Sequence, residues 1–529
     1  MKRTFADRLL AARLQRRSLL IGAGAFTGLA IAGRWPQRLL AQTTFASYPF
    51  TLGVASGDPL PDGVVLWTRL APDPLNGGGM PAADVSVSYT VATDEALQNV
   101  VLQGTTVAAA ALGHSVHVEV SGLQPGRDYW YRFETGGEES PVGRTRTAPA
   151  VGAALSQFKF AIANCQDYRN GFYTAYEHLA QEDLDLVVHL GDYIYENTDF
   201  EGSVRQHGAP EPITAEDYRN RYALYRLDPN LQAAHANFPW TFTWDDHEVD
   251  NNYAGFRPED DQSFEAFVQR RTDAYQVYYE HMPLRSTSMP NGPFLQLFRR
   301  LSFGNLVTFN VLDTRQYRTD QPCGDTFGPR CEESFDFRAT MTGRQQERWL
   351  YSGLNRSTTR WNVMAQQTMF SQFDFGNTAF LPGDFFNADQ WDGYVVQRKR
   401  LSRFLQARKP SNPVVLTGDI HSSWVHDIKV DFDDPDSETV GTEFVCTSIS
   451  SSFGGDEAGT SALVAAAVPG NPHTKFFDGL NRGYIRCTVT PETWQSDYRA
   501  VSTIREATAD VRTLTSFVVE DGQPGAQPA

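Results

Sequence analysis

The chain has 529 residues, of which 41% are hydrophobic and 21% are charged, and its formal net charge is −17 at pH 7. This composition excludes an intrinsically disordered protein, and the acidic charge excludes general nucleic-acid binding through a basic surface. Five cysteines in a chain of this length also exclude a scaffold held by dense disulfide bonds. The length predicts two or more domains.

Residues 1–42 differ from the rest of the chain, since they contain eight Lys or Arg and one Asp. Arg16 and Arg17 precede an apolar, glycine-rich run over 19–33 that is too short for a membrane span. The paired arginines before Ser-Leu-Leu resemble a twin-arginine signal peptide, which implies export by the twin-arginine machinery after folding. We therefore expect a periplasmic or secreted protein without a stable membrane anchor; an uncleaved anchor is the alternative.

Residues 48–147 are expected to be all β. Short runs rich in β-branched and aromatic residues, such as 63–70, 85–92 and 128–135, are separated by clusters of Gly, Pro and Asn. The stretch SGLQPGRDYWYRFE resembles part of a fibronectin type III domain. We predict a small fibronectin- or immunoglobulin-like sandwich here, followed by a linker.

From residue 157 the pattern changes to that of an α/β domain. Apolar runs at 158–165 and 184–192 flank a segment with helical periodicity, which indicates a βαβ unit. Further apolar strands alternate with long helical stretches, so the strands are expected to be buried on both faces. We predict a catalytic domain over 157–515 and disorder in the last nine residues, DGQPGAQPA.

Four of these predicted strands end in residues that bind metals. These residues are Cys165 after the first strand, Asp192 and Tyr195 in GDYIY, Asp245, Asp246 and His247 in WDDHE, and Asp419 and His421 in GDIH. Buried carboxylates at close range are costly unless they bind a cation or share protons. Hard oxygen donors with one thiolate and one imidazole predict a centre with more than one metal ion.

The order of these motifs resembles the calcineurin-like metallophosphoesterases, with three departures. Asp246 stands where Asn is usual, Asp419 replaces a His, and Cys165 replaces the first Asp. With NCQDYRNGFYTAY, HLGDYIYE, WDDHEVDNNYAG, VLDTRQYR, TGDIHSSW and GVASGDP, these departures resemble the PhoD-like alkaline phosphatases and phosphodiesterases. The resemblance covers nearly the whole chain after residue 42. It implies a metallophosphoesterase-type β-sandwich core flanked by helices, after the small all-β domain.

The resemblance also implies Fe3+ and Ca2+ as cofactors, and the residue chemistry agrees. Tyr195 and Cys165 suit a ferric ion, with His421 as a further ligand and Asp192 shared between iron and calcium. Asp246 and Asp419 then face calcium, because carboxylates make a harder and more anionic site than imidazoles. Two further residues are predicted to add carbonyl ligands, Asn251 and Asn252. Zinc is disfavoured because the set has few imidazoles.

The implied activity is hydrolysis of phosphate monoesters or diesters, small or polymeric, by hydroxide that the metals activate. His247 is predicted to contact the phosphate or to protonate the leaving group, and Arg169 to clamp the phosphate, with a surface charge as its alternative. Cys323 and Cys331 are expected to pair after export. A phospholipase D-like or teichoic-acid-directed phosphodiesterase of the same fold is the nearest alternative function. An exported, non-catalytic binding protein is the more distant one.

Overall fold

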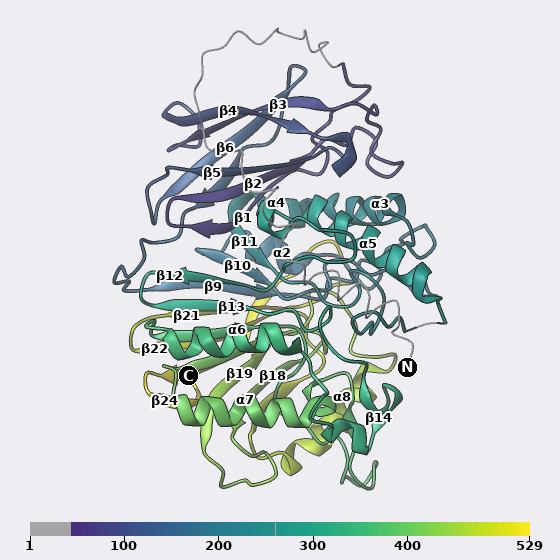
Figure 1. Ribbon diagram of the computed structural model, residues 1–529, viewed down its shortest axis with the longest axis vertical. Coiled ribbons are helices and arrows are strands. Elements are labelled where there is room, and N and C mark those ends of the chain that lie inside the picture. Colours follow the sequence, from purple (N-terminus) through teal and green to yellow (C-terminus); the bar gives the residue numbers. More distant parts are fainter. Residues whose placement is uncertain (1–43, 260) are drawn as a thin grey trace, which may run out of the picture. The chain divides into compact units, whose positions relative to one another are not determined.

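The computed structural model describes residues 44–259 and 261–529, so the predicted signal peptide lies outside the described residues. Two large sheets form the centre of this part (Figure 1). A ten-stranded sheet has the order β24-β23-β22-β21-β9-β10-β11-β1-β2-β5, and a seven-stranded sheet has the order β12-β13-β15-β17-β19-β18-β20. Apolar side chains from both sheets, including Phe160, Phe309 and Phe444, form one buried cluster between them. The predicted α/β class with a sandwiched β core is confirmed.

Three parallel strands, whose residues are mostly apolar, lie in the middle of the ten-stranded sheet. These are β9 (Phe158–Ala163), β10 (Leu186–His189) and β11 (Pro239–Phe242). Four antiparallel strands continue the sheet on the other side of β9: β21 (Gly483–Val489), β22 (Thr493–Val501), β23 (Val511–Glu520) and β24 (Gln523–Pro528). Burial on both faces explains why the three parallel strands read as continuous apolar runs.

The prediction of disorder in the last nine residues is wrong. Residues 523–528 form β24, where Gln527 pairs with Val518 and Ala526 is buried. The predicted domain end at residue 515 falls within β23, so the sheet continues past it. The Gly and Pro residues of this segment suggested disorder. Gly525 instead adopts a φ of 108°, and its backbone N–H donates to the Thr442 hydroxyl at 3.2 Å, which holds the segment in place.

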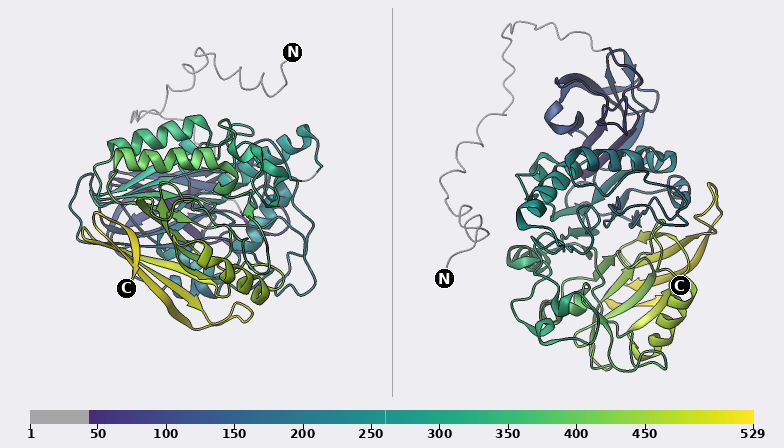
Figure 2. Two further views of the ribbon diagram at one scale, coloured as in Figure 1. Left: turned by 90° about the horizontal axis from the view of Figure 1, so that it is seen from below. Right: turned by 90° about the vertical axis from the view of Figure 1, so that its right-hand side faces the viewer.

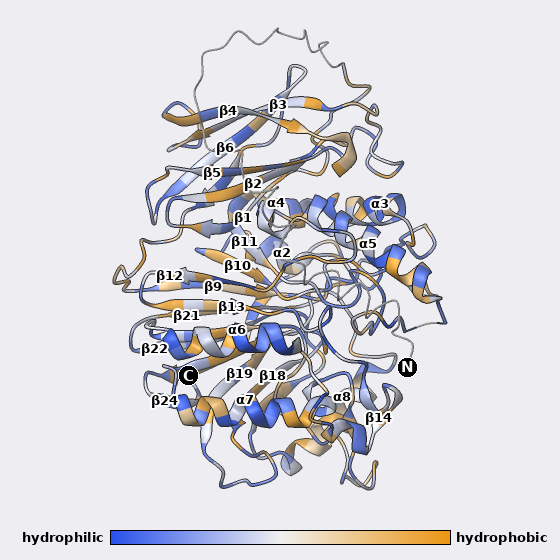
Figure 3. Ribbon diagram, viewed as in Figure 1, coloured by the Kyte–Doolittle hydropathy of each residue, from blue (hydrophilic) through white to orange (hydrophobic). Residues whose placement is uncertain are grey.

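The seven-stranded sheet has a parallel core of β13 (Val307–Val311), β15 (Trp361–Ala365), β17 (Pro413–Thr417) and β19 (Thr439–Val445). Antiparallel strands flank this core: β12 (Arg299–Phe303), β18 (Ser423–Lys429) and β20 (Thr474–Asp478). The helices α6 (Gly343–Arg356) and α7 (Val395–Arg408) cover its outer face and lie side by side in Figures 1 and 2. Figure 3 shows hydrophilic and hydrophobic stretches alternating along α7, as expected for a helix with one buried side.

Four helices cover the outer face of the ten-stranded sheet at β9, β10 and β11. They are α2 (Thr174–Leu179), α3 (Ala215–Arg226), α4 (Pro229–Asn237) and α5 (Phe264–His281). Local signals in the sequence set their starts: Thr214 and Asp217 form a capping box, and Ser263 caps α5. A further helix, α8 (Glu457–Ala467), follows the loop after β19, and a two-stranded sheet pairs β14 (Phe327–Gly328) with β16 (Phe386–Asn387).

The N-terminal strands form two packed layers, but one layer belongs to the ten-stranded sheet. Strands β1 (Val54–Leu60), β2 (Gly63–Arg69) and β5 (Ser115–Ser121) extend the ten-stranded sheet, because β1 pairs in parallel with β11. The second layer contains β3 (Val85–Ala92), β4 (Val100–Ala108), β6 (Asp128–Thr135), β7 (Glu138–Glu139) and β8 (Gly143–Arg146). A separate apolar cluster joins the two layers. Among the described residues, no helix is long and apolar enough for a membrane crossing.

Candidate metal centre

The loops after β9, β10, β11 and β17 meet at the carboxyl ends of these strands, where α/β sheets place ligand groups. The loops after β9 and β10 are tied together because the backbone N–H of Cys165 donates to the Gly191 carbonyl at 3.1 Å. Three groups of side chains have ligand atoms within 4.8 Å of one another: Cys165, Asp192 and His421; Asp192, Asp246 and His247; and Asp245, Asp246 and Asp419. The structure therefore brings the residues of all four predicted strand ends together.

The backbone around this cluster is strained. Five of the predicted ligands have left-handed φ values between 48° and 65°, which non-glycine residues rarely adopt: Cys165, Asp192, Asn252, Asp419 and His421. Such strain is concentrated at functional sites. Gly191 has a φ of 114°, and a Cβ added there would lie 2.5 Å from the Asp245 backbone nitrogen. The glycine of GDYIY therefore allows the loops after β10 and β11 to approach each other.

Tyr195 lies at the centre of the first group. Its hydroxyl donates to Asp192 Oδ2 at 2.8 Å and lies 3.0 Å from His421 Nε2. His421 Nδ1 donates to the Ser452 carbonyl at 2.7 Å, which holds the ring with Nε2 facing the cluster. A histidine held in this way through its other ring nitrogen is typical of metal ligands. A side chain that the sequence did not indicate also reaches this group, since Ser451 Oγ lies 2.8 Å from the Tyr195 hydroxyl.

The second part of the cluster is a set of buried carboxylates with unused oxygens. Asp192 Oδ1, Asp245 Oδ2 and Asp246 Oδ1 are buried and accept no hydrogen bond, although Asp246 Oδ1 lies 3.5 Å from Arg315 Nη2. Buried anionic oxygens without a partner are costly, whereas a bound cation would satisfy them. The donor set of this chain therefore fits metal ions.

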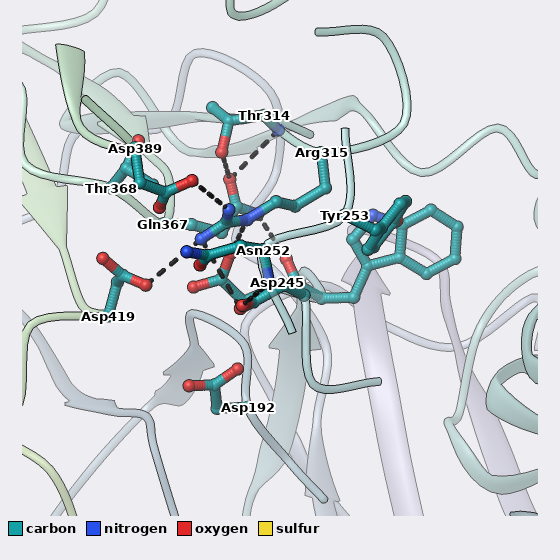
Figure 4. A network of polar contacts seen from close by, with 12 residues as sticks. Asp192, Asp245, Asn252, Tyr253, Thr314, Arg315, Gln367, Thr368, Asp389 and Asp419 are labelled. Atoms are coloured by element: carbon teal, nitrogen blue, oxygen red, sulfur yellow. Dashed lines mark hydrogen bonds and ion pairs between the residues drawn. The ribbon is translucent and has the colours of Figure 1, made fainter. Parts of the chain in front are cut away.

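Arg315 is the cation that the sequence analysis missed (Figure 4). Its fully buried guanidinium donates to Asp245 and lies 2.8 Å from Asp389, 3.2 Å from Asp419 and 3.5 Å from Asp246. One guanidinium cannot balance these carboxylates together with Asp192. The cluster therefore keeps an excess of negative charge, which again favours cation binding.

The surrounding charges separate the pKa values of the carboxyl groups. Burial raises the pKa of Asp246 to about 6, although the charges of Arg315 and His247 oppose this rise. Burial also acts to raise the pKa of Asp192, but His247 and His421 lower it to about 2. Asp192 is therefore ionised at neutral pH, which suits a predicted metal ligand.

Glu248, four residues before the predicted ligand Asn252, fixes two loops at once. Its carboxylate accepts backbone N–H groups from Asp192 at 3.1 Å, Tyr193 at 2.6 Å and Asp245 at 2.8 Å. Burial raises the pKa of Glu248 to about 8 despite these hydrogen bonds. The acid of WDDHE is thus a positioning residue of the loops that carry the ligands.

His247 lines the cavity and is held from behind. Its Nδ1 lies 2.7 Å from Glu196 Oε2, and its ring centroid is 4.1 Å from that of Tyr195. Burial acts to lower the pKa of His247, but the carboxylates of Glu196 and Asp246 hold it well above its usual value. A protonated imidazole facing the cavity suits either a phosphate contact or a proton donor.

The two asparagines lie beside the carboxylates. The Asn252 backbone N–H donates to Asp246 Oδ2 at 2.6 Å, and its side-chain amide donates to Asp325 Oδ2 at 2.8 Å. This contact leaves the side-chain carbonyl oxygen of Asn252 available to a cation, whereas its backbone carbonyl accepts from Gln321 Nε2 at 2.6 Å. The Asn251 backbone N–H donates to Glu196 Oε1 at 3.0 Å, and both asparagines line the cavity.

Arg169 is not brought to the cavity. Its guanidinium contacts both carboxylate oxygens of Asp167, at 3.0 and 2.7 Å, and the carbonyl of Thr198. It does not line the cavity of about 480 Å³ that the candidate ligands border. Its role as a phosphate clamp stays a prediction. The predicted pairing of Cys323 with Cys331 is confirmed.

Comparisons with known proteins identify the family of this chain. The family model described as PhoD-like phosphatase matches residues 160–498, and the model of its N-terminal domain matches residues 35–149. The chain belongs to the PhoD-like phosphatase family. It is 52% identical over 520 residues to alkaline phosphatase D of Bacillus subtilis (strain 168). The aligned region covers 96% of this chain and 88% of that protein.

A solved structure described as "Structure of PhoD" is similar to this chain throughout. The sequence identity is 53%, the TM-score is 0.87, and the match covers 92% of this chain and 93% of that one. The family resemblance predicted from the motifs is confirmed, and the chain is a phosphoric ester hydrolase.

Proposed function

We propose that this chain is an exported, metal-dependent phosphoesterase whose active site is the cavity bordered by Asp192, Asp246 and Asp419. The observation that supports this most strongly is the set of buried carboxylate oxygens without a donor, on Asp192, Asp245 and Asp246. Next to them lie the thiol of Cys165, the phenol of Tyr195 and the imidazole of His421. The salt bridges to Arg315 alone do not compensate these buried carboxylates, so a purely structural ion pair does not account for the cluster.

Fe3+ is the ion that we assign to the first group. Cys165, Tyr195, His421 and Asp192 would hold it, because thiolate and phenolate are donors that proteins use for iron. The thiol pKa of Cys165 is raised by burial and by the carboxylate of Asp192, so a bound cation would be needed to stabilise the thiolate.

Ca2+ is the ion that we assign to the oxygen-rich side. The second oxygen of Asp192, with Asp246 and Asp419, offers the hard anionic donors that calcium prefers. Asn252 would add its side-chain carbonyl oxygen, and Asn251 lies beside it. When bound, the ions would neutralise the phosphate and activate a water as the nucleophile.

The chain's own residues would then orient the ester and supply a proton. His247, held by Glu196, would donate a proton to the leaving oxygen or contact the phosphate. Arg169 stays a predicted phosphate clamp, a role that requires its guanidinium to leave Asp167. Export through the twin-arginine machinery, directed by residues 1–42, would place the enzyme in the periplasm or outside the cell.

The proposal is tested with two cysteine variants. Cys165→Ser should lose bound iron and most of the phosphate release from monoesters and diesters. Cys446→Ser is the matched control, because Cys446 is equally buried but its thiol donates to the Ile162 carbonyl at 3.3 Å. Wild-type iron content and activity in purified Cys165→Ser would contradict the proposal.

A further inference from the structure

A serine-rich segment for which the motifs predict no role contacts three of the four residues assigned to iron. This serine segment, residues 448–452 (Ser-Ile-Ser-Ser-Ser), follows β19. It reaches the three ligands from a part of the chain that supplies no predicted ligand of its own. The ligands that it contacts are Cys165, Tyr195 and His421.

The serine segment uses a different group for each ligand. The backbone N–H groups of Ser450 and Ser451 donate to the Cys165 carbonyl at 3.3 and 3.2 Å. The carbonyl of the last serine in the segment accepts from the imidazole of His421, as described above. The hydroxyl of Ser451 lies 2.8 Å from the Tyr195 hydroxyl, and it is the one side-chain contact of the three.

The serine segment is held firmly by its own neighbours. Arg482 Nε donates to the Ser451 carbonyl at 2.6 Å, and the Ser448 hydroxyl donates to the same oxygen at 2.5 Å. The Ile449 backbone N–H donates to the Asn164 carbonyl at 3.0 Å, next to Cys165. The position of the Ser451 hydroxyl is therefore fixed by the fold and does not depend on the ligands that it contacts.

The Ser451 hydroxyl is fully buried and has two oxygens within its reach. It accepts from the Asp167 backbone N–H at 3.1 Å, and it lies 2.8 Å from both the Cys165 carbonyl and the Tyr195 hydroxyl. Its single proton can serve only one of these two oxygens at a time. The Cys165 carbonyl accepts two backbone N–H groups already, so it stays satisfied when Ser451 donates to Tyr195.

This choice of acceptor matters when Tyr195 binds a cation as a phenolate. The phenol now donates its proton to Asp192, whereas a phenolate has no proton and can only accept. A hydrogen bond to an anionic oxygen is stronger than one between neutral groups, so the phenolate is the preferred acceptor for Ser451. Groups that hold a metal ligand from behind in this way fix its orientation and tune its strength as a donor.

We propose that Ser451 is a positioning residue of the predicted iron site, whose hydroxyl holds Tyr195 against the Cys165 loop and donates a hydrogen bond to the phenolate. This inference rests on the proposed function, because that function assigns Tyr195 and Cys165 to iron.

The test compares the purified, metal-loaded wild type with Ser451→Ala. The first readout is the wavelength of the visible charge-transfer band. It should become longer in Ser451→Ala, because a phenolate without its donor gives up an electron more easily. The second readout is the affinity for Fe3+, measured by competition with desferrioxamine. It should fall about 10- to 100-fold, as is typical when a partner of a metal ligand is removed.

Ser450→Ala is the matched control. Ser450 is equally buried, but its hydroxyl donates to the Asp167 carbonyl at 2.8 Å, and its backbone N–H to Cys165 survives the substitution. Ser450→Ala should therefore keep the wild-type band and Fe3+ affinity. Ser451→Thr retains the hydroxyl and should also keep the band, whereas Ser451→Gly removes it and is the second variant if Ser451→Ala does not fold.

A wild-type band and Fe3+ affinity in Ser451→Ala or Ser451→Gly would overturn the inference and leave the proposed function intact. Equal changes in Ser450→Ala and Ser451→Ala, or a shift in Ser451→Thr as large as that in Ser451→Ala, would overturn it as well, since packing alone would then explain the effect. A wild-type enzyme without iron or without the band would overturn the proposed function, and this inference with it.

Discussion

Arg315 and Asp245 form an ion pair in which neither side chain is more than 1% exposed. The same guanidinium also reaches Asp389 and Asp419, so it joins loops of both large sheets at the candidate metal centre (Figure 4). Buried charges are costly when one partner is removed, because the other stays uncompensated.

Arg315→Met is therefore expected to lower the free energy of unfolding by about 3–5 kcal/mol, measured by urea denaturation at fixed metal concentration. Arg338→Met is the control, since Arg338 pairs with Asp336 but is 73% exposed, and its midpoint should stay at the wild-type value. Equal midpoints for the two variants would show that the Arg315 network does not stabilise the fold.

His247→Asn should distinguish the two roles predicted for this residue. If His247 protonates the leaving group, kcat for alkyl phosphates should fall about 10²- to 10⁴-fold. The loss should be much smaller for p-nitrophenyl phosphate, because p-nitrophenolate leaves without a proton. Equal losses for both esters would instead assign His247 to phosphate binding. His178→Asn is the control, since His178 binds the Ala509 carbonyl away from the cavity.

The N-terminal strands are expected to stabilise the catalytic part of the enzyme. Trp67 on β2 is fully buried, donates to the Glu280 carbonyl at 2.9 Å and lies 4.0 Å from the Arg226 guanidinium. Trp67→Ala should lower the free energy of unfolding by about 3–5 kcal/mol in one cooperative transition.

Deletion of residues 44–147 tests the same point more severely. It would expose the edge of β11 that β1 now pairs, so we expect an aggregating product. A soluble truncated enzyme with wild-type kinetics would contradict this expectation.

The residues of the candidate site were predictable where they directly follow an apolar strand. They were not predictable where they come from loops without such a signal. Cys165, Asp192 and Asp419 each end an apolar run, so the sequence pattern alone places them at one edge. Asp389 has no such local signal, and it meets Arg315 from a loop 74 residues further along the chain. The pairing of β1 with β11 likewise joins strands about 180 residues apart and leaves no trace in either segment.

Protonation of His473 is expected to cause part of the decrease in the free energy of unfolding at acid pH. Burial lowers its pKa to about 4, although the Gln372 carbonyl, 2.6 Å from Nε2, favours the protonated ring. The unfolded chain titrates this group near pH 6.5, so between pH 6.5 and 4 the unfolded state binds more protons. The free energy of unfolding should therefore fall as pH falls through this window, by up to about 1.4 kcal/mol per pH unit.

His473→Gln keeps a donor for the Gln372 carbonyl but does not titrate. Its free energy of unfolding should depend less steeply on pH between 6.5 and 4, by up to one proton, in urea unfolding at several pH values. Identical slopes for the variant and the wild type would contradict the assignment.

The central claim is that the cluster around Asp192 binds Fe3+ and Ca2+. Elemental analysis of the purified, folded enzyme, combined with its visible absorption spectrum, tests it most directly. We predict iron and calcium together, with a charge-transfer band that Tyr195→Phe abolishes. Tyr193→Phe should keep the band, because the Tyr193 hydroxyl binds His235 instead, at 2.8 Å. Zinc alone, active enzyme without metal, or an unchanged band in Tyr195→Phe would contradict the account.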